Sequence, residues 1–127
     1  MKVVCFGDLN LDFYTSEPLE SVATLTEKDF RKLLFSIGGH GANQAVAAAL
    51  FGAPTYFVGR VGNDFAGQLG RTVLQEEGLN IDYVTVDPCE KTGIVVIDPE
   101  RPSAPIILPG TNCVRSSSLN CYQKGNY

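Results

Sequence analysis

The chain of 127 residues is long enough for one domain with a substantial hydrophobic core and too short for two domains of ordinary size. Its composition, 44% apolar and 19% charged, is that of a globular protein. A net charge of −4 argues against nucleic-acid and anionic-membrane partners, because both require clustered Lys and Arg. No apolar run is long enough for a secretory signal or a membrane span, so we expect a cytoplasmic protein.

Cysteine and histidine are too sparse and too widely spaced for a zinc site. The chain has four cysteines, Cys5, Cys89, Cys113 and Cys121, no C-x-x-C pair and a single histidine, His40. Without a secretory signal the default expectation is free thiols, and a disulfide between Cys113 and Cys121 is the alternative. The sequence therefore predicts no metal ligands.

The opening residues predict a strand followed by a polar segment. Residues 2–6 (Lys-Val-Val-Cys-Phe) form a short apolar run that is typical of a parallel strand buried on both faces. Asp8, Asn10 and Asp12 follow its carboxyl end, where open α/β sheets bind ligands. For Asp8 and Asn10 we favour turn formation through side-chain bonds to nearby N–H groups. A calcium loop, which the D-x-N-x-D order also opens, is excluded because Phe13 stands where such a loop needs glycine.

The next segment leaves two structures open. Residues 13–25 show no periodic pattern and predict an irregular connection. Residues 26–34 have a threonine cap, an early glutamate and apolar residues at helical spacing, which predicts a helix. A strand over residues 33–37, leading into the glycines that follow, is the competing prediction, and a run this short does not decide between them.

Three glycines within four residues precede an alanine-rich run over residues 42–50. This order predicts a flexible turn and a short helix, which Gly52 and Pro54 end. Uncovered N–H groups at the helix start would offer donors and partial positive charge to an oxygen-rich ligand. The alternative is a simple connection in which Asn43 caps the helix. Neither the dinucleotide fingerprint nor the Walker phosphate loop matches these glycines.

The residues that follow continue an α/β pattern. Residues 55–59 are a β-rich run, which completes a strand–helix–strand unit with an expected right-handed connection. Asn63-Asp64 predicts the cap of a helix over residues 65–77, whose apolar stripe we assign to the core. Residues 81–86 alternate weakly and predict an edge strand.

A hairpin is the last predicted element. Residues 92–98 predict a strand that pairs with residues 106–108, and the three prolines between residues 98 and 105 predict a wide turn. Residues 113–127 lack an apolar period and predict a loop or a disordered tail.

The glycine segment carries a family resemblance. The order Gly38-Gly39-His40-Gly41-Ala42-Asn43-Gln44-Ala45, with Gly52 and Gly62 at the following spacings, resembles the first signature of the ribokinase-like (PfkB-type) carbohydrate kinases. The likeness extends from Gly7–Asp12 to Pro109–Asn112, so it covers residues 1–112 and not residues 113–127. It implies an α/β fold: a Rossmann-like βαβ parallel sheet, incomplete here, with a small lid of β-strands. Residues 1–112 would then form the sugar-binding N-terminal part of the domain.

The same resemblance implies the site. Matching motif positions give sugar contacts at Asp12, Gly38, Gly39 and Asn43, with Asn10 and Asn112 as further contacts. Asp and Asn suit sugar hydroxyls because they accept and donate hydrogen bonds at fixed geometry. His40 stands where ribokinases often carry lysine, and we interpret it as a residue at the rim of the site. Ribose and fructose are the leading substrates, and nucleosides or sugar phosphates remain open.

Catalysis in this family moves the γ-phosphoryl of ATP, with Mg²⁺, to a sugar hydroxyl. The family's base and anion cradle come from a Gly-Ala-Gly-Asp motif that is absent from these 127 residues. We therefore assign no catalytic residue, ATP contact or metal ligand. One hypothesis is the sugar-binding part of an ATP-dependent carbohydrate kinase of ribokinase or fructokinase type. The alternative is a truncated, non-catalytic remnant that lacks the ATP-binding half and the base.

The predicted hairpin also bears on assembly. In several members of the family the lid strands pair subunits, which makes a homodimer through these strands an expectation. Proline in the connection is equally a device against unwanted edge pairing, so the hairpin by itself does not require a partner.

Overall fold

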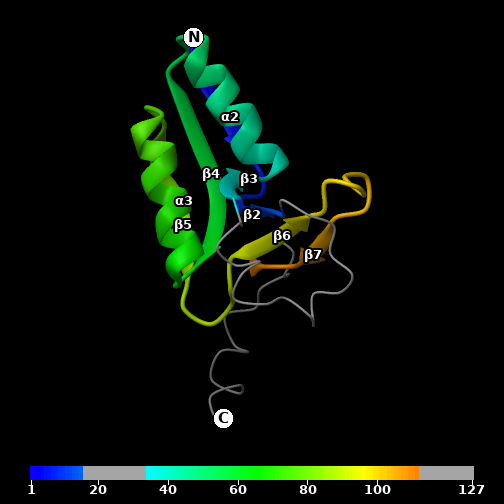
Figure 1. Cartoon of the computed structure of the whole chain (residues 1–127). Helices are drawn as coiled ribbons and strands as arrows, with labels where there is room; N and C mark the ends of the chain where they lie inside the picture. The colour runs from blue at the N-terminus through cyan, green and yellow to red at the C-terminus, as the bar shows by residue number, and fades with distance from the viewer. Residues whose placement is uncertain (16–33, 112–127) are drawn as a thin grey trace.

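A computed structural model describes residues 1–15 and 34–111 (Figure 1). Within these ranges, one sheet is parallel and has the order β1-β4-β5, formed by β1 (Val3–Phe6), β4 (Thr55–Gly62) and β5 (Asn80–Asp87). Helices α2 (His40–Leu50) and α3 (Phe65–Glu76) pack against it, α2 on β1 and β4 and α3 mainly on β5. The predicted strand–helix–strand unit is confirmed by the parallel pairing of β1 with β4.

A second sheet lies at the carboxyl end of the first, and we call it the lid. Its order in the described chain is β3-β2-β6-β7, formed by β3 (Leu34–Gly38), β2 (Asn10–Tyr14), β6 (Gly93–Ile97) and β7 (Ile106–Leu108). β2 runs antiparallel to β3 and parallel to β6, and β7 returns antiparallel to β6. The predicted hairpin is confirmed, and so is the strand predicted over residues 33–37, which the structure describes from Leu34 on.

The core lies between the parallel sheet and its two helices. The largest fully buried apolar side chains include Phe57, Val61 and Leu74. Leu9 joins them, although it belongs to the connection between β1 and β2, and it is fully buried. Burial of a leucine contributes about 1.5–3 kcal/mol. Leu9 therefore fixes the point where the chain passes from the parallel sheet to the lid.

Two predictions about strands are wrong. Residues 10–14 form strand β2, whereas a turn was predicted at Asn10 and an irregular connection from residue 13; the alternation of buried Leu11 with its polar neighbours fits a lid strand. Strand β1 is not buried on both faces, since Val4 and Phe6 are 64% and 81% exposed. Both helices pack on the opposite face of the sheet, so these two side chains have no layer over them in the described part of the chain.

The helix predictions need smaller changes. α2 begins at His40, two residues earlier than predicted, so two residues of the glycine turn are helical. Asp64 caps α3 as predicted, with its Oδ1 accepting a hydrogen bond from the N–H of Gly67 at 2.9 Å. The apolar stripe of α3 is core at Ala66 and Leu74, but Phe65 is exposed.

Some sequence predictions concern residues outside the described ranges. These are the part of the irregular connection from residue 16 on, the helix up to residue 33, the contact at Asn112 and the tail over residues 113–127. Among the described cysteines, Cys5 is a free thiol, whereas Cys89 is disulfide-bonded, which corrects the expectation there. That expectation rested on the absence of a secretory signal, which does not tell which sulfur atoms a fold brings together. None of the described helices is long and apolar enough to cross a membrane.

Candidate functional site

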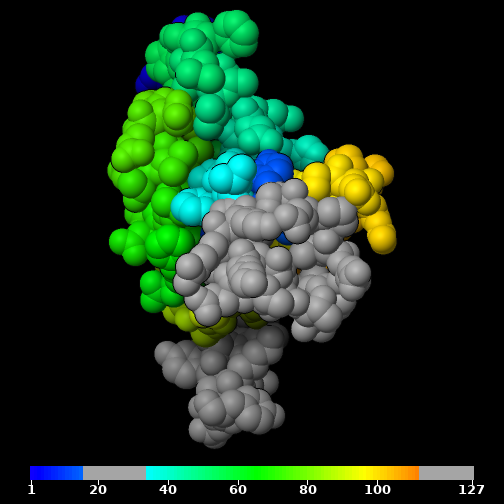
Figure 2. All heavy atoms as spheres, viewed as in Figure 1, coloured from blue at the N-terminus to red at the C-terminus, as the bar shows by residue number. Residues whose placement is uncertain are grey.

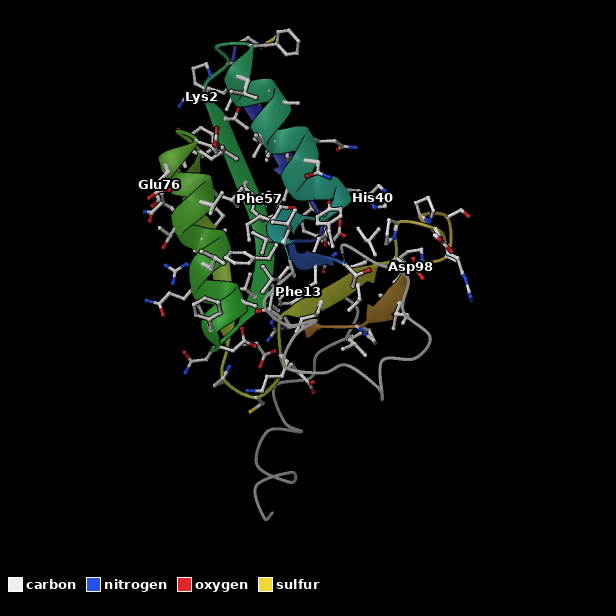
Figure 3. All side chains as sticks on the ribbon, viewed as in Figure 1. Lys2, Phe13, His40, Phe57, Glu76 and Asp98 are labelled. Atoms are coloured by element: carbon white, nitrogen blue, oxygen red, sulfur yellow. The ribbon has the colours of Figure 1, made fainter. Side chains whose placement is uncertain are left out.

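A hollow of about 370 Å³ opens between the lid and the start of α2, and we call it the lid hollow. In the space-filling view, β2 (blue) reaches the surface between β3 (cyan) and the wide turn over residues 98–105 (yellow) (Figure 2). Figure 3 shows His40 at this end of α2, on the side of the lid. Polar groups come from the β1–β2 connection, β2 and α2, and apolar groups from β6 and β7. The lining residues are Asp8, Asn10, Asp12, Gly39, His40, Asn43, Val95, Pro105, Ile107, Leu108, Pro109 and Gly110.

Asp12 supplies the hollow with a buried acceptor that has no hydrogen-bond partner among the described residues. Its Oδ1 is shielded from solvent and accepts no hydrogen bond within the described chain. Burial, and secondarily the negative charge of Asp8, raise the pKa of Asp12 above its ordinary value. Buried polar atoms are almost always satisfied, and an orphaned one costs about 1–3 kcal/mol. An unpaired carboxylate oxygen in a hollow is therefore suited to a hydroxyl donor from a ligand.

Gly38 does not line the hollow but makes room for this carboxylate. A Cβ atom built on Gly38 would overlap the carboxylate of Asp12, which lies on the neighbouring strand of the lid. Gly39 has a φ of 104°, a conformation that favours glycine, and a Cβ there would lie 2.5 Å from the backbone oxygen of Asp8. These two glycines therefore shape the site through space and backbone conformation.

Asp8 caps α2 from across the chain. Its Oδ1 accepts a hydrogen bond from the N–H of Gly41 at 3.2 Å, and its backbone oxygen accepts one from Ala42 at 3.1 Å. Its Oδ2 accepts from the side-chain amide of Asn10 at 3.1 Å. The prediction of uncovered N–H groups at the start of this helix is therefore wrong, because two of these N–H groups donate to Asp8. The local bond to Asn10 agrees with the predicted turn role, but the bonds to α2 span more than thirty residues.

Asn43 has no capping role and faces the lid hollow. The N-cap position of α2 is Gly39, which has no side chain that could cap the helix. The N–H of Asn43 donates to the backbone oxygen of Gly39 at 2.9 Å, as in a regular helix. The exposed side chain of Asn43 lines the same hollow as Asp12. The fold thus brings together four of the sequence-predicted positions: Asn10, Asp12, Gly39 and Asn43.

The apolar wall of the hollow was missed by sequence reasoning. Val95 of β6 pairs with Asp12 of β2, and Ile107 of β7 pairs with Val95, so all three share one face of the lid. The strand period of two by itself would have placed each of these apolar residues on one of the two faces of its own strand. Only the register between β2 and β6 places that face beside the carboxylate.

The arrangement defines a class of protein: a parallel α/β unit with a β-strand lid and a part-enclosed hollow, lined by both polar and apolar groups, at the carboxyl end of the sheet. The chain belongs to the pfkB family of carbohydrate kinases, whose family model matches residues 1–112. A ribokinase from Arabidopsis thaliana is 36% identical over 116 residues, which cover 87% of this chain and 30% of that protein. A fructokinase from Escherichia coli is 32% identical over 119 residues, which cover 85% of this chain and 37% of that protein.

Solved structures agree with this fold. Arabidopsis thaliana ribokinase complexed with ribose and ATP matches with a TM-score of 0.71 and 33% identity, covering 87% of this chain and 36% of that one. Fructokinase from Vibrio cholerae O395, with fructose, ADP and calcium ion bound, matches with a TM-score of 0.73 and 25% identity. The match covers 91% of this chain and 35% of that one. The chain spans about a third of the length of the curated relatives it matches.

Proposed function

We propose that residues 1–112 form the sugar-binding N-terminal part of an ATP-dependent carbohydrate kinase of ribokinase or fructokinase type. Phosphorylation of a sugar hydroxyl belongs in this proposal to the complete protein. The proposed sugar contacts are Asp12 and Asn43 by side chain and Gly39 by close backbone approach, with Asn10 and Asn112 as further contacts. Gly38 belongs to the same site in this proposal, where it leaves room for the Asp12 carboxylate. Family membership and relatives named as ribokinases and fructokinases support the substrate class.

The observation that carries the proposal is the orphaned oxygen of Asp12 in the lid hollow. A polyol presents several hydroxyl donors, and one of them would satisfy that oxygen. Asn43 adds a donor and an acceptor from α2, and Val95 and Ile107 offer apolar surface to the carbon face of the ring. A mixed polar and apolar lining of this kind suits a small sugar better than a charged or wholly apolar ligand.

The described residues do not fit an ATP phosphate cradle. The N–H groups of Gly41 and Ala42 already donate to Asp8, and the sequence has no Gly-Ala-Gly-Asp motif. In residues 1–15 and 34–111, no three His, Cys, Asp or Glu side chains gather in a way that would hold a metal ion. The ATP and Mg²⁺ implied by the family are therefore assigned to no residue here, and no step of phosphoryl transfer is derived.

Calorimetric titration of the chain with D-ribose and D-fructose tests the proposal. We expect one of the two sugars to bind, and Asn43→Ala to weaken that binding about 5- to 30-fold, as loss of one or two hydrogen bonds would. Gln44→Ala is the matched control, since Gln44 is the next exposed residue of α2 and does not line the hollow. Binding of neither sugar, or equal effects of the two variants, would count against the proposal.

A second candidate is a non-catalytic folding unit that binds no sugar. The observation in its favour is the face of the parallel sheet opposite the helices, where Val4, Phe6 and Tyr83 are all more than half exposed. Parallel sheets are ordinarily covered on both faces, and large exposed apolar patches promote association. A non-cooperative thermal melt together with absent sugar binding would favour this candidate.

We also propose that the lid strands pair two copies of the chain. Phe35 of β3 and Ile106 of β7 lie on the lid face that carries Phe13, and both are exposed. Sedimentation equilibrium should give a dimer whose dissociation constant rises for Phe35→Ser. A monomer at all accessible concentrations would contradict this pairing.

A further inference from the structure

The hairpin of β6 and β7 enters the lid at Thr92, whose backbone and side chain are both bound by Asp64. The N–H of Thr92 donates to Asp64 Oδ2 at 2.9 Å, and its hydroxyl donates to Asp64 Oδ1 at 2.8 Å. The same hydroxyl accepts a hydrogen bond from the N–H of Gly62, at the end of β4, at 2.9 Å. The entry to the hairpin is therefore joined to the parallel sheet and to the start of α3.

The exit from the hairpin is bound by a second carboxylate, that of Asp87 at the end of β5. Asp87 is 2% exposed. Its Oδ1 accepts the N–H groups of Cys89 and Glu90 at 2.9 and 3.0 Å. Its Oδ2 accepts the hydroxyl of Thr111 at 3.1 Å and pairs with Nη2 of Arg60 at 2.9 Å. Both oxygens of this buried carboxylate are thus satisfied by groups from the two ends of the hairpin and from β4.

Backbone contacts bring the two ends of the hairpin together at the same place. The N–H of Thr111 donates to the backbone oxygen of Lys91 at 2.7 Å. Gly110 lies so close to Gly93 that a Cβ on Gly110 would overlap the Gly93 backbone. The entry and exit form one closed base, and Asp64 and Asp87 hold that base on the end of the parallel sheet.

The hairpin needs such a base because it buries little apolar surface, so that hydrophobic burial contributes little to keeping it in place. The three residues of β7 are 42%, 61% and 53% exposed, and in the described chain β7 pairs only with β6. Segments with few buried apolar contacts open at low free-energy cost. Yet this hairpin carries Val95, Ile107, Leu108 and Gly110, which form one side of the lid hollow.

We propose that Thr111 and Asp87 at the exit, with Thr92 and Asp64 at the entry, are positioning residues of the sugar site, which hold the β6–β7 hairpin over Asp12. This inference rests on the proposed sugar-binding function of the lid hollow. None of the four carboxylate and hydroxyl groups needs to touch the sugar. They act by fixing the hairpin that bears the apolar wall.

Thr111→Val and Thr111→Ser test the inference in the full chain. Valine keeps the shape but removes the hydroxyl that donates to Asp87, whereas serine retains it. Thr85→Val is the matched control, because the Thr85 hydroxyl also donates a hydrogen bond, in this case to the backbone oxygen of Gly59 at 3.3 Å, and Thr85 does not line the lid hollow. The measurements are amide hydrogen exchange by mass spectrometry and the dissociation constants for D-ribose and D-fructose.

We expect Thr111→Val to speed exchange in residues 93–97 and 106–110 about fivefold or more, with β4 and β5 unchanged, and to raise the sugar dissociation constant about fivefold. Thr111→Ser should restore both values to within about twofold of the wild type, and Thr85→Val should alter neither. Unchanged exchange in the hairpin, or equal acceleration throughout the parallel sheet, would overturn the inference. Thr92→Val gives the same test at the entry if Thr111→Val does not fold.

The two proposals fail in different ways. A wild-type chain that binds neither sugar refutes the proposed function, and hairpin exchange in Thr111→Val then decides whether this base holds the lid. A wild-type chain that binds sugar, with Thr111→Val binding equally well despite a loosened hairpin, refutes the positioning role alone.

Discussion

Replacing Asp12 with asparagine should weaken sugar binding and at the same time stabilise the fold. The carboxylate has an orphaned buried oxygen and a pKa raised first by burial and then by the charge of Asp8. Asparagine keeps the shape and one acceptor oxygen and removes the charge. Hydrogen bonds to a charged group contribute about 1.5–3 kcal/mol and those to a neutral group about 0.5–1.5 kcal/mol. The difference of about 1–1.5 kcal/mol predicts a dissociation constant about 5- to 10-fold higher.

The effect on stability has the opposite sign. Because the folded state raises the pKa of Asp12, the folded protein holds a proton at pH values where the unfolded chain has released it. The ionised group therefore costs stability at neutral pH, and that cost is recovered as the pH falls through the raised pKa toward the ordinary value of 3.8. Asp12→Asn should increase the free energy of unfolding at pH 7, and the gain should shrink with acidification.

Urea unfolding at pH 7 and pH 4, together with sugar titration, measures both effects. Asp82→Asn is the control, because Asp82 is an exposed residue of β5 outside the lid hollow, and its Oδ2 accepts a hydrogen bond from the side-chain amide of Asn80 at 2.9 Å. It should change sugar affinity by less than about twofold. The reasoning is refuted if Asp12→Asn lowers stability at pH 7, or if it binds sugar as tightly as the wild type.

Three further predictions concern other parts of the molecule. Gly38→Ala should displace the Asp12 carboxylate and weaken sugar binding about 10-fold or more in calorimetry, and unchanged affinity would contradict the close packing. Burial by itself would raise the pKa of Asp64, but hydrogen bonds from Thr92 and Gly67 and the charge of Lys91 together lower that pKa below the ordinary value of 3.8. The pKa of Asp87 is also lowered, and the largest cause is the hydrogen bond from the N–H of Cys89. Stability should therefore fall as the pH drops from about 4 toward those lowered values, and urea unfolding of Asp64→Asn should show a shallower acid decline. Phe6→Thr should reduce concentration-dependent association in analytical ultracentrifugation, because it removes the most exposed apolar side chain of the uncovered sheet face; equal association would show that another surface is responsible.

Local signals in the sequence determined much of the fold. The Asp64 cap, the alanine-rich run of α2 and the β-branched run of β6 act within one turn or one strand, so they can be read without tertiary contacts. The glycine-rich motif likewise pointed to the family, and the family model matches the same residues 1–112. Motif positions, not chemistry read from single residues, selected Asp12 and Asn43.

Tertiary structure alone decided how these pieces meet. Strand β2 owes its existence to pairing with β3 and β6, whereas a turn was predicted at Asn10 and an irregular connection from residue 13. Asp8 was assigned to a local turn, whereas it caps a helix more than thirty residues away. The register of β2 with β6 places Val95 beside Asp12, and no spacing in the chain encodes that register. Sequence periodicity indicates which side of a helix or strand is buried. Which other element packs against that side is decided only when all elements of the fold pack together.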